Sequence, residues 1–308
     1  MPFSTEKGIV FIVNNSRFEL KKQETRQAEE MLRAAECIVF ASHKGGTGRT
    51  TSCLSIAGHL ARSGSKVLVV DFDPQANATS GLGIDVTKLQ HTIYDVLLDH
   101  CVGDHSMSIT RVILETDVEN LHVAPSEFNL NVAEVFMQGT ANRVGMLDRI
   151  LEEVRPLYDY ILIDVPSSSG LLTINGLYAS DRIVVPLDLS IFSLESVGNL
   201  ETSLHDIRRM AGRSINQATA VLIRYVKPNV FSRMFHNRNP SQEVEERLRA
   251  MFHTVFVVPF SVQIYQAQRE GIPISHYAPG SKVGKAYARI ANSLSIDGNR
   301  KNQREDGK

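Results

Sequence analysis

Apolar and polar residues follow one another along the chain in blocks that predict strands alternating with helices. Continuous apolar runs at 37–42, 65–73 and 159–164 show no period-two alternation, as expected of strands covered on both faces. The same reasoning predicts further strands at 121–126, 181–188, 218–226, 254–260 and 273–277. Helical spacing predicts helices at 50–63, 92–99, 128–137, 143–157, 191–210 and 281–294. This order predicts an α/β, doubly wound, mainly parallel sheet with helices on both faces.

The two ends of the chain differ from this pattern. Residues 1–36 are expected to be an N-terminal extension, with a strand at 8–13 and a charge-rich helix at 17–36. They are too few for a helix-turn-helix segment, so operator binding is not expected. The main domain is expected at 37–296, and residues 297–308 form a polar tail without an apolar face.

Composition narrows the class of protein. The 308 residues are 43% hydrophobic, enough for a sizeable core. With 33 Lys and Arg against 34 Asp and Glu, the net charge is −1, so nucleic-acid binding would need a local basic patch. Three cysteines without a CxxC pair argue against a disulfide framework or zinc site and favour a reducing cytosol. No apolar run approaches the roughly 18 residues of a membrane span, and the N-terminus does not have the pattern of a signal peptide.

The stretch SHKGGTGRTTS, residues 42–52, is a candidate phosphate-binding loop. Measured against G-x-x-x-x-G-K-[ST], it has His43 in place of the first glycine and Arg49 in place of the lysine. Its context is nevertheless that of such a loop, because a buried strand precedes it and a helix follows. Backbone N–H groups and the helix N-terminus would face an anion there. The alternative is a glycine-rich turn without a ligand.

Five ordered segments together resemble the ParA/MinD family of deviant Walker A ATPases, and the ParA-type partition ATPases most closely. They are KGGTGRTT (44–51), DFDPQANATSGLG (71–83), ILIDVPSSSG (161–170), VVPLDLSIFSLESV (184–197) and the segment 257–294. The resemblance covers about residues 37–295. It implies a P-loop fold, with ATP and Mg²⁺ held between two facing subunits of a homodimer.

The resemblance also implies roles for individual residues. Lys44 would reach the partner's phosphates and take part in catalysis, and Asp73 would position the attacking water. Gln75 would support the switch after Asp73. The residues implied to hold the nucleotide are Lys44, Gly45, Gly46, Thr47, Gly48, Arg49, Thr50 and Thr51. Thr50, Asp164 and Asp71 are the implied metal residues, since acids beside phosphates need Mg²⁺ to offset their repulsion. The alternatives are an exposed loop lysine and solvated acids at strand ends.

Arg49 stands where the family carries the lysine that bridges the β- and γ-phosphates. Arginine keeps the charge but is longer, planar and forked, so the exchange is not conservative. Backbone amides would preserve nucleotide binding, whereas the transition state depends on the placement of charge. We therefore predict binding with weakened or absent hydrolysis. A replacement introduced to trap the ATP state is a second explanation of Arg49.

Residues 207–240 contain seven basic residues and no acid. In ParA proteins, basic residues of this half bind DNA without sequence preference. The candidate DNA-binding residues are Arg208, Arg209, Arg213, Lys227, Arg233 and Arg238, while Arg224 lies within a strand pattern. The alternative is a solvated basic face.

The resemblance implies a cytoplasmic, nucleoid-associated protein that partitions DNA or positions cargo, with a ParB-like or other stimulating partner. Two alternatives differ in class: a non-hydrolysing, nucleotide-gated regulatory module, and a MinD-like membrane-associated positioning ATPase. The polar tail disfavours membrane binding. An iron–sulfur cluster is not expected, because no cysteine follows PSSSG.

Overall fold

The computed structural model describes residues 35–42, 44–188, 218–225, 246, 248–252 and 254–295. The predicted strand at 8–13, the helix at 191–210 and the polar tail lie outside these residues. Of the helix predicted at 17–36, the last two residues are described. Glu36 is the first residue of a strand, so the prediction is wrong at that end.

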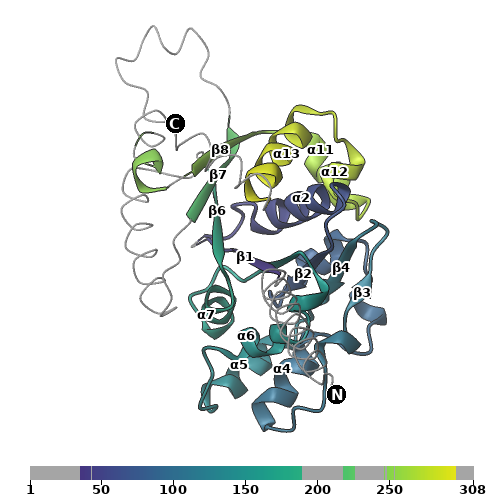
Figure 1. The fold of residues 1–308 in the computed structure, drawn as a ribbon, viewed down its shortest axis with the longest axis vertical. Coiled ribbons are helices and arrows are strands. Elements are labelled where there is room, and N and C mark those ends of the chain that lie inside the picture. The colour runs from purple at the N-terminus through teal and green to yellow at the C-terminus, as the bar shows by residue number, and fades with distance from the viewer. Residues whose placement is uncertain are drawn as a thin grey trace, which may run out of the picture.

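One eight-stranded sheet forms the centre of the molecule (Figure 1), in the order β3-β4-β2-β5-β1-β6-β7-β8. Its strands are β1 (Glu36–Phe40), β2 (Val67–Asp71), β3 (Leu114–Glu115), β4 (Leu121–Ala124), β5 (Tyr160–Asp164), β6 (Arg182–Asp188), β7 (Ala218–Tyr225) and β8 (Thr254–Pro259). Only the β3–β4 pair is antiparallel among the described pairs. The predicted fold class is confirmed.

Helices cover both faces of this sheet (Figure 1). On one face lie α2 (Arg49–Arg62), α11 (Val262–Arg269), α12 (Ile274–Tyr277) and α13 (Lys282–Leu294). On the other lie α4 (Ile93–Val102), α5 (Leu130–Gln138), α6 (Met146–Glu152) and α7 (Leu171–Tyr178). The short helix α3 (Asn77–Gly81) follows β2, and single 3₁₀ turns occur at Val86–Lys88, Ile109–Arg111 and Arg155–Leu157.

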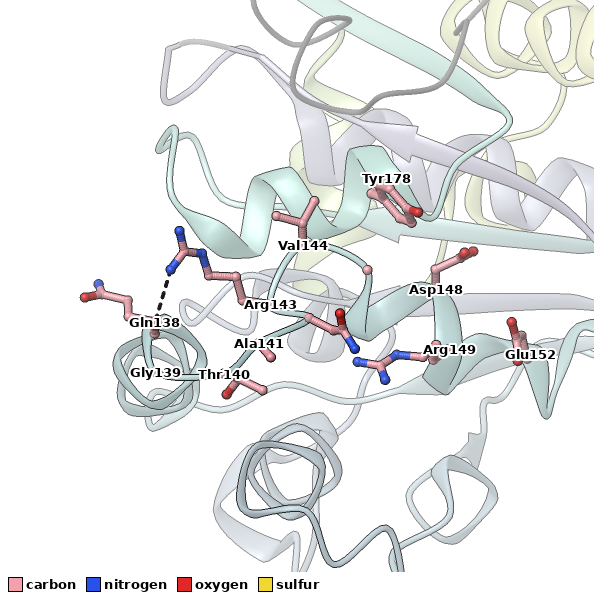
Figure 2. A pocket seen from close by; sticks show the side chains of 12 residues that line it. Gln138, Gly139, Thr140, Ala141, Arg143, Val144, Asp148, Arg149, Glu152 and Tyr178 are labelled. Atoms are coloured by element: carbon pink, nitrogen blue, oxygen red, sulfur yellow. Dashed lines mark hydrogen bonds between the residues drawn. The ribbon is translucent and has the colours of Figure 1, made fainter.

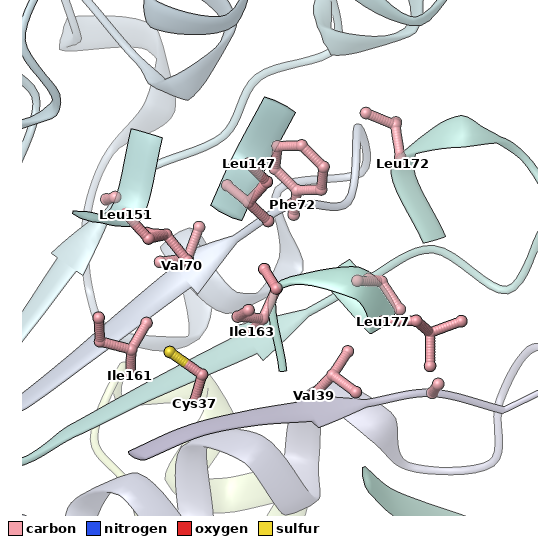
Figure 3. Close-up of a cluster of buried hydrophobic side chains, with 14 of the residues drawn as sticks. Cys37, Val39, Val70, Phe72, Leu147, Leu151, Ile161, Ile163, Leu172 and Leu177 are labelled. Carbon is pink, nitrogen blue, oxygen red and sulfur yellow. The ribbon is translucent and has the colours of Figure 1, made fainter. Parts of the chain in front are cut away.

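The continuous apolar runs are explained by two hydrophobic clusters, one on each face of the sheet. Along β1, Cys37 and Val39 belong to the cluster under α6 and α7, whereas Ile38 and Phe40 belong to the cluster under α2 and α13. Figure 3 shows the first cluster, where Val39, Val70 and Ile163 of three neighbouring strands lie near side chains of the covering helices. Because both sets are buried, these strands have no polar face to produce alternation.

Two predicted elements differ from the structure. Residues 273–277 were expected to be a strand but form the short helix α12, which packs on α2. The helix expected at 143–157 is divided into α6 and a 3₁₀ turn that contains Pro156 near its start. Proline lacks the backbone N–H that a continuing helix needs, which accounts for the division.

Candidate functional site

The candidate phosphate loop connects β1 to α2 through two glycines with positive φ. Gly46 has φ 75° and Gly48 has φ 73°, values that side chains with a Cβ rarely adopt. A Cβ on Gly48 would also lie 2.7 Å from Cδ1 of Ile223 on β7. The positive φ favours glycine at position 48, and the close contact would also force Ile223 to move. The loop therefore keeps its backbone close to the sheet edge, where β7 closes one side.

Hydrogen bonds within the loop hold this shape. The hydroxyls of Ser42 and Thr47 are 2.6 Å apart, so one of them donates to the other, and both lie within hydrogen-bond distance of the Lys44 carbonyl, at 3.2 and 3.1 Å. Thr47 is buried. The interactions of Thr47 thus shape the loop through its side chain, a role that the spacing alone did not identify.

A cleft of about 770 Å³ opens beside the loop and the start of α2. Its loop side is formed by Gly46, Thr47, Gly48, Arg49, Thr50 and Thr51, so six of the predicted nucleotide residues meet in one cavity. The opposite wall comes from the end of β8 and from α11, and includes Pro259, Phe260, Tyr265 and Gln268. Sequence reasoning did not single out these four residues, although they lie within the segment 257–294 that carries the family resemblance. Gln268 donates from Nε2 to Thr51 Oγ1 at 2.9 Å, which links the two walls.

Thr50, which lines the cleft at the start of α2, contacts Asp164 at the end of β5. The Thr50 hydroxyl donates to Asp164 Oδ2 at 2.6 Å, while Asp164 Oδ1 is buried and has no hydrogen-bond partner. Burial, and then the neighbouring carboxylate of Asp71, raise the pKa of Asp164 to about 8, against the lowering effects of Thr50 and Arg49. A cation beside Asp164 would remove this penalty on its charged form. The predicted metal pair is therefore assembled.

Asp71 lies next to Asp164 across the β2–β5 pair, but both of its carboxylate oxygens already accept hydrogen bonds. Asp71 Oδ2 accepts from the amide and hydroxyl of Thr79, both at 2.7 Å, and Oδ1 accepts from the Asp73 amide at 3.3 Å. Burial raises the pKa of Asp71 to about 6, and the bonds from Thr79 oppose that rise. In this arrangement Asp71 fixes the segment after β2, and a direct metal role stays a prediction.

Asp73 lies within reach of Arg49. Its Oδ2 is 3.5 Å from Arg49 Nη2, and its Oδ1 accepts from the Gln75 amide at 2.9 Å. The Gln75 backbone thus contacts Asp73, while the Gln75 side chain lies at an exposed position. The role of Gln75 in the switch after Asp73 stays a prediction. Asp73, Arg49 and Asp164 converge on the same end of the sheet.

The site contains a buried hydrogen-bond donor and a buried acceptor that both lack partners. Among the residues that the structure describes, four buried side-chain atoms lack a hydrogen-bond partner: Glu36 Oε2, Arg49 Nε, His59 Nε2 and Asp164 Oδ1. Two of the four are therefore here, one donor and one acceptor. Leaving such groups unpaired costs about 1–3 kcal/mol each. A phosphate oxygen would satisfy the donor and a cation the acceptor, so the residues fit a metal–nucleotide complex.

Lys44 and Gly45 occupy the outer part of the loop. Both are exposed, and the cleft lining begins at Gly46. A Cβ on Gly45 would lie 3.8 Å from Ser167 Oγ, in the loop that follows β5. The catalytic role of Lys44 in a partner's site stays a prediction.

The candidate DNA-binding residues Arg208, Arg209, Arg213, Lys227, Arg233 and Arg238 lie outside the described residues. Part of the same half is described, and there α13 presents Lys282, Lys285 and Arg289 at exposed positions, without an acidic residue in the helix.

A second cleft, of about 930 Å³, lies between the loop joining α5 to α6 and Tyr178 (Figure 2). Arg143 extends along it and donates to the Gln138 carbonyl at 3.1 Å. Asp148 and Glu152 also line it, but it contains none of the residues predicted to hold nucleotide or metal. None of the helices in the described ranges is both long and apolar enough to cross a bilayer.

Comparison with known proteins found a family model and relatives that match most of the chain. A family model described as an AAA domain matches residues 35–218. The chain is 35% identical over 264 residues to the sporulation initiation inhibitor protein Soj of Bacillus subtilis, covering 85% of this chain and 98% of Soj. It is 30% identical to the chromosome partitioning protein ParA of Caulobacter vibrioides, covering 83% and 92% of the two chains.

A solved structure shares the fold and is similar in sequence over most of the chain. Cobyrinic acid a,c-diamide synthase from Mycobacterium smegmatis, with bound ATP analog and magnesium, has a TM-score of 0.67 and 26% identity. The match covers 84% of this chain and 94% of the synthase.

Proposed function

Because the chain belongs to the ParA/MinD family of P-loop ATPases, we propose that it binds ATP with Mg²⁺ in the cleft beside α2. Two buried atoms without a hydrogen-bond partner carry this proposal, the donor Arg49 Nε and the acceptor Asp164 Oδ1. A phosphate oxygen would accept from the first, and a cation would bind the second. Thr50 and Asp164 hold the metal, directly or through water, as Mg²⁺ prefers oxygen ligands and retains several waters. The loop amides and Arg49 hold the phosphates.

The far wall of the cleft suits the nucleoside part of the ligand. Phe260 and Tyr265 are each 63% exposed there, and Pro259 adds a further apolar surface. Aromatic side chains that lie open at a cleft provide flat faces for a base. The loop would thus bind the polar end of the nucleotide and this wall its apolar end.

We propose that the nucleotide-bound protein is a homodimer with Lys44 of each subunit reaching the other's phosphates. The exposed position of Lys44, outside its own cleft, supports this arrangement. A compact ammonium on a flexible stem suits a contact made across an interface.

The proposed dimer binds DNA without sequence preference and acts in DNA partition or cargo positioning in the cytoplasm, on the nucleoid. The basic residues at 207–240 and the exposed cations of α13 would contact phosphates. A stimulating partner, ParB-like or other, would trigger release from DNA.

Arg49 favours a second candidate of a different class, a nucleotide-gated regulatory module that does not turn over. Its guanidinium occupies the lysine position and is ion-paired with Asp73, the residue predicted to position water. Phosphate release in a single-turnover measurement separates this module from an ATPase.

Gel filtration with light scattering in ATP, ADP and no nucleotide tests the proposed function, followed by DNA binding at two salt concentrations. We expect a dimer with ATP alone, and DNA affinity that falls steeply as salt rises. A chain that stays monomeric and does not bind ATP contradicts the proposal. If the protein forms the dimer but does not bind DNA, or binds it equally well at both salt concentrations, only the proposed DNA binding is contradicted.

A further inference from the structure

Arg49 makes a set of contacts that lysine could not make. Its Nη1 lies 3.3 Å from both the carbonyl and the hydroxyl oxygen of Ser42, and its Nη2 lies 3.5 Å from Asp73 Oδ2. The guanidinium therefore spans from the end of β1 to the segment after β2. A planar fork with several donors can serve two partners at once, whereas an ammonium is a single point.

This ion pair is sheltered from solvent. The side chains of Arg49 and Asp73 are 11% and 8% exposed. Charges with this little exposure are screened by salt far less than surface pairs. The contact thus holds Asp73 in place more firmly than a surface contact would.

Asp73 is fully engaged while the pair exists. Its Oδ1 accepts from the Gln75 amide and its Oδ2 faces Arg49. A carboxylate in this state has its charge neutralised by the guanidinium. With one oxygen bonded to the Gln75 amide and the other facing Arg49, the carboxylate has less room to accept a hydrogen bond from an attacking water.

The same guanidinium retains one donor for a ligand. Arg49 Nε is buried and has no acceptor, and Arg49 lines the cleft at the phosphate loop. Guanidinium groups bind phosphate through two parallel N–H donors. Engaging a phosphate in that way would draw Nη2 or Nη1 from its present partners.

We propose that Arg49 is a positioning residue that clamps Asp73 in the nucleotide-free protein and releases it when phosphates take the guanidinium. This inference rests on the proposed nucleotide site and adds a link between its occupancy and the readiness of Asp73. In the empty site the carboxylate is held and neutralised. In the filled site Arg49 faces the phosphates, and Asp73 keeps only the bond from Gln75.

A double-mutant cycle on nucleotide affinity tests the release. Calorimetry with Mg²⁺ and a non-hydrolysable ATP analogue gives Kd for the parent, Arg49→Ala, Asp73→Ala and the double variant. Separate attractions to the ligand cancel in the cycle, leaving the change in the Arg49–Asp73 interaction upon binding. Only the parent must break the Arg49–Asp73 contact to bind the analogue. Its Kd is therefore expected to be on the order of tenfold higher than the value calculated from the three variants by assuming additive effects.

The same cycle on thermal unfolding, without nucleotide, tests the clamp itself. The double variant is expected to lose less Tm than the sum of the single variants, by a few degrees. If alanine at these positions prevents folding or binding, Arg49→Lys and Asp73→Asn replace it in both cycles, since lysine keeps the charge without the fork.

A second buried ion pair provides the matched control. Arg155 Nη2 and Asp148 Oδ1 are 2.8 Å apart, and their side chains are 17% and 14% exposed. The backbone carbonyl of Arg155 accepts from the Ala35 amide, so this pair lies at the end of β1 opposite the phosphate loop. Its unfolding cycle should show coupling, but its binding cycle should be additive.

Additive unfolding temperatures for Arg49 and Asp73 would overturn the clamp. Coupling in unfolding together with an additive binding cycle would overturn the release. Absence of nucleotide binding by the parent contradicts the proposed function and the release together, while the unfolding cycle still decides whether the pair exists.

Discussion

At the scale of single residues, Arg49 and the family's lysine differ in shape more than in charge. The guanidinium reaches Ser42 and Asp73 together, so part of its charge is directed away from the cleft. Phosphoryl transfer depends on where cations sit relative to the transferring group. Charge placement is therefore expected to limit hydrolysis more than nucleotide binding.

We predict that Arg49→Lys raises ATP turnover about a hundredfold, as expected if the replacement restores one charge contact of about 3 kcal/mol in the transition state. Steady-state phosphate release at saturating ATP and Mg²⁺ measures it. Arg62→Lys is the control, because it makes the same exchange near the end of α2, where Arg62 donates to the Ser275 carbonyl at 2.8 Å. Equal rates for the parent and Arg49→Lys would contradict the assigned role.

The residue types of the site could be predicted from the sequence, but their partners could not. Thr50, Asp164 and Arg49 were identified by their positions in motifs. The bond from Arg49 to Ser42 and the bonds from Thr79 to Asp71 join residues only seven and eight positions apart, and they depend on how the loops after β1 and β2 turn back on themselves. Motif spacing carries no information on such side-chain distances.

At the scale of elements, most strands and long helices were predicted because burial on both faces of the sheet leaves a strong apolar signal. The boundaries of β5 and β6 agree to within one residue with the patterns at 159–164 and 181–188. Short helices were missed or mistaken. The helix α12 has four residues, too few for helical periodicity to appear, and its pattern resembles that of a short strand.

The helix α2 also carries a buried titratable group, His59, which predicts a dependence of stability on pH. His59 is 7% exposed and its Nε2 lacks a partner. Burial, and then the charge of Arg62, lower the pKa of His59 to about 4. The unfolded chain takes up this proton near pH 6.5, and the folded protein takes it up near pH 4. Stability due to His59 is therefore lost as the pH falls from about 6.5 toward 4.

We predict that His59→Gln reduces the loss of unfolding free energy between pH 7 and pH 5 by about 1–2 kcal/mol relative to the parent. Denaturant unfolding at pH 7, 6 and 5 measures the difference. His91→Gln, which changes an exposed histidine, controls for the removal of one titrating group. Parallel curves for His59→Gln and the parent would show that burial of His59 does not govern this acid response.

At the scale of the whole molecule, an exposed apolar surface lies on the outer side of α5. Its side chains lie on α5 or just before it and are exposed by 44% to 72%: Phe128, Val132, Val135 and Phe136. The opposite side of α5 is buried in the core. Glu134 Oε1 accepts from the Leu172 amide at 3.4 Å, which joins α5 to the start of α7.

The loop that follows β5 connects this surface to the nucleotide site. Ser167 of that loop lies beside Gly45, and Gly170, at its end, lies beside Glu134. We therefore expect a second subunit that reached the phosphate loop to contact the outer side of α5 as well. Burial of an aromatic and aliphatic patch is typical of the central part of a subunit interface.

We predict that Val135→Glu weakens the proposed ATP-dependent dimer at least tenfold, because a carboxylate would be buried in an apolar interface without a partner. Light scattering across a concentration series with Mg²⁺ and a non-hydrolysable ATP analogue gives the dimer dissociation constant. Val102→Glu is the matched control, since Val102 is 65% exposed at the end of α4. Nucleotide affinity of the monomer should be unchanged in both variants. A dimer that tolerates Val135→Glu as well as Val102→Glu would show that the subunits meet without α5, and the exposed apolar patch would then need a different partner.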